Sequence, residues 1–199
     1  MRRQDSPLEV ELEPRNPLNE TPPVPPESAR QQAIYASAEI DGSRPAQLVG
    51  QFHSVYGMPD RVRDRLPASL DTDRLDMRMG LIAEETSELF AAVYGPEAAE
   101  LVTQATASAP DQGERDLVET ADALADLVYV VYGMALEMGI DLDAVLAEVH
   151  SSNLSKLMPD GTVRRRADGK ILKGPGFREP DIGAVIRKRD QEVERGAGS

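Results

Sequence analysis

The chain has 199 residues, 40% of them hydrophobic, which is enough for one ordinary domain with tails. Its 22 Lys and Arg against 35 Asp and Glu give a net charge of −13, which argues against binding to a nucleic acid polymer. The chain contains no Cys, so disulfides and thiolate metal sites are excluded and a cytoplasmic location is expected. No apolar run reaches the roughly 18 residues that span a bilayer, and no signal-peptide pattern opens the sequence, so no membrane association is expected.

The amino-terminal part is rich in proline. Seven of the 15 prolines fall in the first 26 residues, among Glu, Asn and Ser. Such a segment has too little apolar surface to fold alone, so residues 1–46 are predicted to form a disordered tail, with at most a short helix over 28–39. No chemistry is assigned to this tail.

Helical patterns follow, separated by glycine and proline. They predict helices from Gln47 to a stop at Gly57, then over 70–94, 97–107, 114–138 and 141–153, the last capped by Asp141. These elements predict an all-α domain over residues 47–186, built as a bundle of four or five helices. A charged tail is expected over 187–199.

The helix predicted over 70–94 carries three carboxylates on one side. Glu84, Glu85 and Glu88 lie together beside an apolar stripe. Exposed faces usually alternate Glu with Lys or Arg, but here the nearest cation, Arg78, lies nearly two turns earlier. The face is therefore unlike an ordinary solvated helix surface. The stripe is formed by Met79, Ile82, Leu89, Phe90 and Val93.

The helix predicted over 114–138 is apolar nearly all round except for a second acidic group. At ~100° per residue, Glu119, Asp122 and Asp126 fall within about 60° of one another. A helix with this pattern is expected to be buried, and clustered buried carboxylates need a cation. If the two acidic helices pack antiparallel, their carboxylates form an all-oxygen cage, which favours Mg²⁺ or Mn²⁺ over Zn²⁺.

The carboxyl-terminal part is locally basic. Between Lys156 and Arg178 there are seven basic residues against two acidic ones, which indicates an anion-binding surface in an acidic chain. Two Asp-Gly pairs at 160–161 and 168–169 predict turns, and TVRRR between them predicts a short extended arm. The three arginines of that arm, 164–166, are expected to be exposed rather than to bind a ligand.

These motifs together resemble a known family. The pair E-E-x-x-E (Glu84, Glu85, Glu88) and E-x-x-D (Glu119, Asp122) resembles the MazG-like all-α nucleotide pyrophosphohydrolase superfamily. Residues 122–157 with the later PDG, RADGKILKGPGF and EPDI are similar to its phosphoribosyl-ATP-pyrophosphohydrolase-like and dUTPase-like branch. The resemblance covers residues 49–182, although the linker 94–115 is longer and richer in Ala than in minimal members.

The resemblance implies hydrolysis of a nucleoside triphosphate between the α- and β-phosphates, giving a monophosphate and pyrophosphate. It assigns Glu85, Glu88, Glu119 and Asp122 as metal ligands. Glu84 is the candidate for orienting or deprotonating the water, because a carboxylate can act as the general base. The remaining assignments are Asp126 as a residue that fixes ligand geometry, and Asn153, Lys156 and Lys173 as substrate-binding residues.

Several alternatives stay open. The substrate is expected to be dUTP or another non-standard nucleotide, but the phosphoribosyl-ATP of histidine biosynthesis fits the same motifs. A non-catalytic nucleotide or metal sensor, and an interaction protein that uses its proline-rich tail, are the other classes. Asn153 and Lys156 could simply end a helix, and Lys173 could be an ordinary loop residue.

Packing roles are expected for the histidines and the central tyrosines. His53 and His150 have no metal-ligand spacing, and Tyr129 and Tyr132 fit packing, with one ring available to stack on a base. A single helical pair cannot cover the apolar circumference of the second acidic helix. A homodimer or a higher homo-oligomer is therefore expected, as the resemblance also implies.

Overall fold

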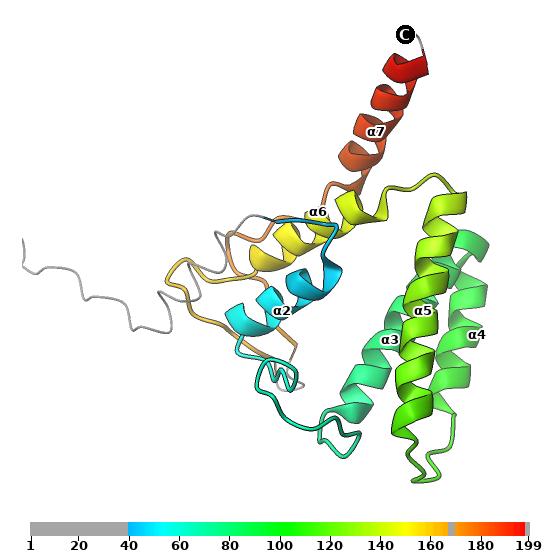
Figure 1. The fold of residues 1–199 in the computed structure, drawn as a ribbon, viewed down its shortest axis with the longest axis vertical. Helices are drawn as coiled ribbons and strands as arrows, with labels where there is room; N and C mark the ends of the chain where they lie inside the picture. The colour runs from blue at the N-terminus through cyan, green and yellow to red at the C-terminus, as the bar shows by residue number, and fades with distance from the viewer. Residues whose placement is uncertain (1–39, 167–169, 198–199) are drawn as a thin grey trace, which may run out of the picture.

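A computed structural model describes residues 40–166 and 170–197 of the chain (Figure 1). The predicted all-α class is confirmed, since this part of the chain is helical with no strand longer than an isolated bridge. The predicted tail before residue 40 and the turn at 168–169 lie outside the described residues. The helices are α2 (Pro45–Val55), α3 (Leu75–Tyr94), α4 (Pro96–Ala107), α5 (Leu117–Glu137), α6 (Leu142–Leu154) and α7 (Ile182–Ala197).

The core lies where α2 packs on α6. Val55 and Tyr56 at the end of α2 are fully buried against Leu154 at the end of α6. The Tyr56 hydroxyl donates to the backbone carbonyls of Asn153 and Leu154 at 2.7 and 3.1 Å, which satisfies carbonyls that the end of a helix leaves without a partner. Six partly buried apolar residues from several parts of the chain pack against this core: Ile40, Phe52, Met58, Leu157, Val163 and Ile171.

Helices α3 and α4 form a tight antiparallel hairpin. Gly95, with φ of 96°, ends α3 and precedes Pro96, the first residue of α4. Glycine adopts this backbone conformation without strain, and proline fits the first turn of a helix because it lacks the N–H that would have no partner there. The Ser87 hydroxyl donates to the Ala99 carbonyl at 3.1 Å and ties the two helices together.

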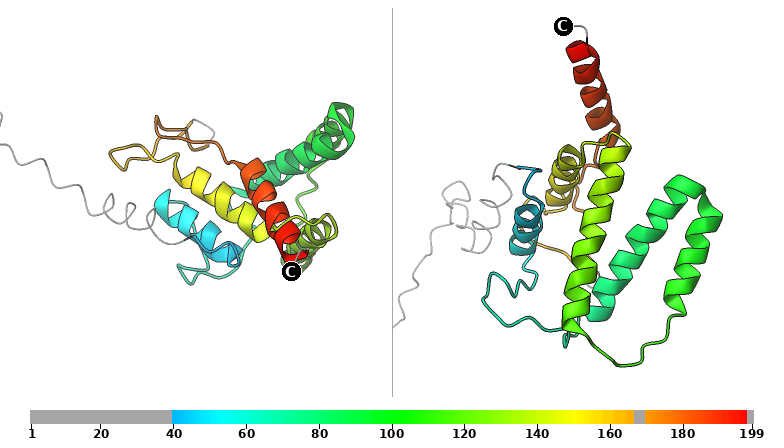
Figure 2. Two further views of the ribbon diagram at one scale, coloured as in Figure 1. Left: turned by 90° about the horizontal axis from the view of Figure 1, so that it is seen from above. Right: turned by 45° about the vertical axis from the view of Figure 1, so that its right-hand side comes forward.

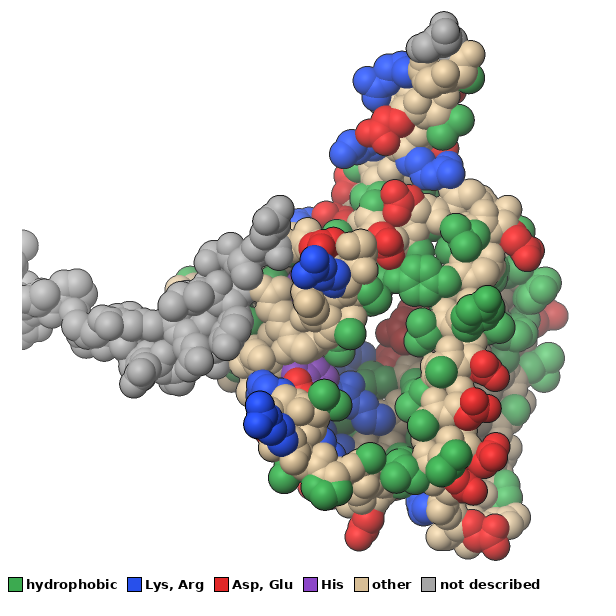
Figure 3. Space-filling model, viewed as in Figure 1, with side chains coloured by type: hydrophobic (Ala, Val, Ile, Leu, Met, Phe, Trp, Pro, Cys, Tyr) green, Lys and Arg blue, Asp and Glu red, His purple; other side chains and the backbone are tan. Residues whose placement is uncertain are grey.

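The long helix α5 was expected to be buried, and in the single chain this prediction is wrong. Asp116 caps the helix by accepting from the N–H groups of Val118 and Glu119, but Ala135 is the buried residue that α5 contributes. Val118, Tyr129 and Leu136 are 75%, 81% and 77% exposed. Figure 3 shows hydrophobic and acidic side chains side by side along this open face.

The antiparallel pairing of α3 with α5 is also not formed within one chain. The two helices begin at the same end of the molecule and diverge (Figure 2), and α3 packs on α4 while α5 contacts α6. The reason is topological. The segment 96–107 forms a full returning helix, so α3 and α5 run in the same direction.

The carboxyl-terminal part forms an arm and a projecting helix. The predicted extended arm is confirmed by an antiparallel bridge between Arg165 and Ile171. The segment expected to be a charged tail from 187 onward is instead part of α7, which packs on α6 and then extends away from the body (Figures 1 and 2). Among the described residues, no single helix is long and apolar enough to cross a membrane; α5 and α6 reach that length and composition only as a pair bent by 113°.

Candidate functional site

The acidic cluster of α3 faces the carboxyl-terminal arm. Lys170 Nζ lies 3.2 Å from Glu84 Oε1, and the two side chains are about half exposed, which joins residues 86 positions apart. Partial burial raises the pKa of Glu85, and repulsion by Glu88 and Glu84 raises it further, whereas Lys170 and Lys156 lower it. The carboxylates are therefore crowded together and lie within electrostatic range of two lysines.

The end of α6 supplies the next part of the site. Lys156, which follows α6, donates from Nζ to Oδ1 of Asn153 in the last turn of that helix, at 2.7 Å. Burial lowers the pKa of Lys156, and the charges of Lys173 and Lys170 lower it further, while Glu85 opposes this effect. The structure therefore brings Asn153 and Lys156, predicted as substrate-binding residues, together with Glu85.

Three ammonium groups converge here, and we call Lys156, Lys170 and Lys173 the lysine cluster. Lys173 lies 4.2 Å from the centre of the Phe177 ring and 3.6 Å from Glu179 Oε1. The prediction from sequence placed Lys156 and Lys173 in the site but missed Lys170. Its only signal was membership of the basic segment 156–178, which does not tell which lysines meet α3.

The arm is held in place by close backbone contacts. The Gly174 N–H donates to the Lys156 carbonyl at 3.2 Å, and a Cβ added to Gly174 would lie 3.0 Å from the Leu157 oxygen. The Arg165 guanidinium donates to the Tyr56 carbonyl, so this arginine has a structural role, and its neighbours Arg164 and Arg166 are exposed, as expected. These contacts fix Lys170 and Lys173 relative to the end of α6.

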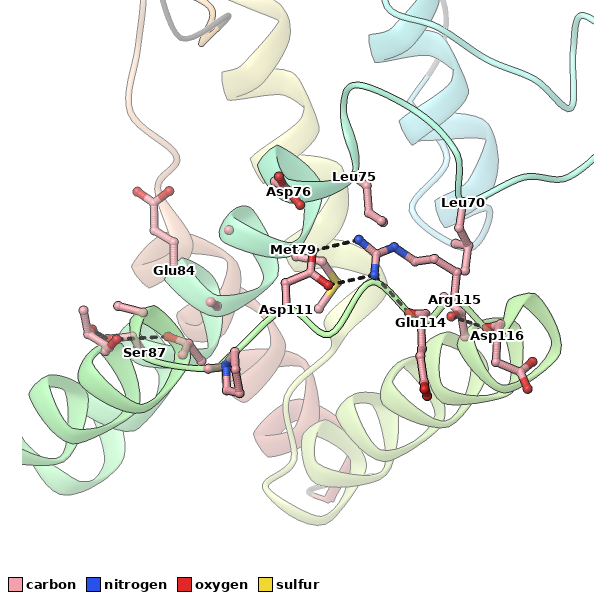
Figure 4. Close-up of a pocket in the computed structure, with 18 of the residues that line it drawn as sticks. Leu70, Leu75, Asp76, Met79, Glu84, Ser87, Asp111, Glu114, Arg115 and Asp116 are labelled. Carbon is pink, nitrogen blue, oxygen red and sulfur yellow. Dashed lines mark hydrogen bonds and ion pairs between the residues drawn. The ribbon is translucent and has the colours of Figure 1, made fainter.

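Glu84 also lines a groove of about 900 Å³, which lies between α3, α4 and the linker 108–116 (Figure 4). Glu84 and Glu88 of α3 line this groove, and the ion pair between Asp111 and Arg115 lies between Glu84 and Asp116 in Figure 4. Arg115 holds the pKa of Asp111 at about 2. The remaining wall is largely apolar or hydroxylated, formed by residues such as Leu75, Met79, Ala83, Ser87, Thr103 and Thr106.

The carboxylates of α5 are not part of this arrangement. Glu119, Asp122 and Asp126 lie on the exposed helix α5, which does not pack on α3. Within residues 40–166 and 170–197, no group of three or more acidic or histidine side chains is placed to hold a metal ion. The cage expected from antiparallel packing is therefore not formed inside one chain, because α3 and α5 run parallel and diverge.

Both histidines make structural contacts, as expected. His150 is buried, with Nε2 at 2.9 Å from Gln51 Oε1, and this links α6 to α2. His53 lies between the Pro59 carbonyl, 2.7 Å from Nδ1, and Arg78, 3.0 Å from Nε2. Tyr132 donates to Asp143 at 3.0 Å, whereas Tyr129 has no packing role within the single chain because it is exposed.

Comparison with known proteins places this arrangement in a family. Residues 49–153 match the phosphoribosyl-ATP pyrophosphohydrolase family, and the match includes both acidic clusters and the whole of α3 to α5. The chain belongs to the phosphoribosyl-ATP pyrophosphohydrolase family. This membership confirms the resemblance to the MazG-like nucleotide pyrophosphohydrolases and the all-α fold.

Two relatives are informative. An uncharacterized protein of Acanthamoeba polyphaga mimivirus is 32% identical over 103 residues, which is 49% of this chain and 32% of the viral protein. The chain thus spans about a third of the length of that relative. The crystal structure of a candidate NTP pyrophosphohydrolase from Exiguobacterium sp. 255-15 is similar with a TM-score of 0.56 and 25% identity, covering 74% of this chain and 97% of that one.

Proposed function

We propose that this protein is a Mg²⁺-dependent nucleoside triphosphate pyrophosphohydrolase. The observation that carries the proposal is the apposition of the α3 carboxylates to the lysine cluster, with Lys170 Nζ 3.2 Å from Glu84. Hydrolysis of a phosphoric anhydride needs negative charge to be neutralised on the phosphates and a water to be aligned for attack. In this proposal the lysines neutralise the phosphate charge, and Glu84 aligns the water.

The donor set fits a hard divalent cation. Glu85 and Glu88 on α3, with Glu119 and Asp122 on α5, would supply only carboxylate oxygens, which Mg²⁺ and Mn²⁺ prefer. The pKa of Glu85 is raised by partial burial and by the charges of Glu88 and Glu84, and a bound cation would offset the repulsion among these carboxylates. What such a cation supplies when bound is charge neutralisation at the phosphate oxygens and a more acidic water.

The α5 carboxylates would come from a second copy of the chain. Within one chain α3 and α5 run parallel, but a helix related by a two-fold axis can approach α3 in the opposite direction. The exposed apolar face of α5 supports this assembly, because monomeric proteins rarely leave so long a hydrophobic surface in water. Asp126, one turn beyond Asp122, would then fix the orientation of the ligands.

The substrate we propose is dUTP or another non-standard nucleotide. Lys156 and Lys173 would bind its phosphates, and Asn153 and a tyrosine such as Tyr129 lie on the elements that would contact the base. A second candidate is phosphoribosyl-ATP, which the family match itself favours. Both substrates are cleaved at the same α–β anhydride, so the mechanism is common to them.

A pyrophosphate-release screen tests the function. With Mg²⁺ present, we expect turnover of dUTP or another nucleotide, and loss of about a thousandfold or more in Glu85→Gln and Asp122→Asn, because each loses an anionic ligand. Glu137→Gln, which removes an acidic side chain at the other end of α5, is the matched control and should retain activity.

Thermal melts of the same variants separate loss of metal from loss of fold. The melting temperature of the wild type should rise with millimolar Mg²⁺, and the rise should vanish in Glu85→Gln although that variant stays folded. A wild type that releases no pyrophosphate from any nucleotide, phosphoribosyl-ATP included, would contradict the proposal. Turnover of phosphoribosyl-ATP alone would favour the second candidate.

A further inference from the structure

The lysine cluster brings three like charges close to one another, although Lys170 and Lys173 also pair with Glu84 and Glu179. Lys156 is half-buried, and its partner is the neutral amide oxygen of Asn153 at 2.7 Å. The charges of Lys173 and Lys170 are near enough to disfavour its protonated form. A fold that holds three ammonium groups this close is arranged for a multivalent anion, because an anion removes their mutual repulsion.

Each lysine approaches this point from a different part of the backbone. Lys156 follows α6, and Lys170 immediately precedes Ile171, the bridge partner of Arg165. Lys173 precedes Gly174, whose N–H donates to the Lys156 carbonyl at 3.2 Å. Lys170 differs from the other two, because it contacts an α3 carboxylate, Glu84, at 3.2 Å. It thus joins the basic arm to the acidic cluster.

We propose that Lys170 completes a cradle for the leaving diphosphate of the substrate, and that it exchanges its ion pair with Glu84 for a phosphate oxygen when the diphosphate binds. This inference rests on the proposed function, since it assigns the diphosphate to the leaving side of the reaction. The exchange also frees the Glu84 carboxylate, the candidate for orienting the water. Lys170 would thereby couple occupation of the phosphate site to the availability of Glu84.

The contact between Glu84 and Lys170 predicts the direction in which substitution of Glu84 changes the affinity for pyrophosphate. Because Glu84 competes with the anion for Lys170, Glu84→Gln should bind inorganic pyrophosphate more tightly than the wild type, by about two- to fivefold. Glu88→Gln removes the same charge one turn further along α3 and should tighten binding less. A purely structural ion pair would not give this difference.

The experiment is calorimetric titration of the full chain with inorganic pyrophosphate in EDTA, so that no divalent cation takes part. Lys170→Met should weaken binding about fivefold or more, and Lys170→Arg should restore most of the affinity. Lys188→Met, on the exposed face of α7, is the matched control and should bind as the wild type does. Melting temperatures establish that each variant is folded.

The outcomes distinguish this inference from the proposed function. If Lys170→Met binds pyrophosphate as the wild type does, or if Glu84→Gln and Glu88→Gln shift the affinity equally, the cradle and the exchange are wrong. If the binding pattern holds but no nucleotide is hydrolysed, the diphosphate cradle stands and the proposed activity falls. If hydrolysis occurs without the pattern, only the role of Lys170 is overturned.

Discussion

Glu84 and Glu85 are adjacent in sequence but differ in their surroundings. Being about 100° apart on α3, they point in different directions. Both side chains are exposed; Glu84 contacts Lys170 and also lines the groove, whereas partial desolvation and the charges of Glu88 and Glu84 raise the pKa of Glu85. The like charges around Glu85 fit the proposed role of this residue as a cation ligand, and the separate direction of Glu84 fits its proposed role toward the water.

At the scale of residues, the sequence indicated which kinds of side chain form the site better than it indicated which of them contact one another. Lys156 could be assigned to the substrate site because the family resemblance includes the residues that follow the helix over 141–153, although its proximity to Glu85 came from the structure. Lys170 could not be assigned to the site, since its contact with Glu84 depends on how the arm folds back through Gly174 and Arg165. Such long-range placement has no local signal in the sequence.

His150 predicts a pH dependence of stability. Burial lowers its pKa below the ordinary value of 6.5, so the unfolded chain binds a proton that the folded chain does not. Stability should therefore fall as the pH decreases from about 7 to 5. Thermal melts across this range should show a shallower decrease in His150→Gln than in the wild type; equal slopes would show that this histidine does not contribute.

At the scale of elements, helix boundaries followed from local chemistry. Gly95-Pro96 separates α3 from α4, and Asp141 caps α6 by accepting from the Ala144 N–H at 3.0 Å, both as predicted. The surroundings of α5 could not be predicted in this way. An apolar pattern indicates that a helix face packs against something, but not whether the same chain or another chain supplies the packing surface. Helix α7 was missed because its charge suggested a tail.

The arm offers a test of how the lysine cluster is held. Gly174→Ala would put a Cβ 3.0 Å from the Leu157 oxygen and 3.1 Å from the Lys156 oxygen, which should cost about 1–3 kcal/mol and loosen the arm. Gly176→Ala meets no atom within 4 Å and serves as the control. Melting temperature and limited trypsin digestion should change in the first variant only; equal behaviour would show that the arm is not clamped there.

At the scale of the whole molecule, the open face of α5 is the dominant feature. It combines exposed apolar side chains with the acidic residues Glu119, Asp122 and Asp126, and Figure 3 shows the molecule hollowed beside it. A second copy that covered this face would bury the apolar surface and deliver the carboxylates in one step. Assembly and catalysis would then depend on the same helix.

Subunit complementation tests this central claim most directly. Glu85→Gln and Asp122→Asn chains, each with its own affinity tag, are co-expressed and the mixed dimer is isolated through both tags. If α3 of one copy works with α5 of the other, one of the two sites in each mixed dimer is intact. Pyrophosphate release should then return to about half of the wild-type rate, although each parent is inactive. A mixed dimer as inactive as its parents would contradict a site shared between two chains.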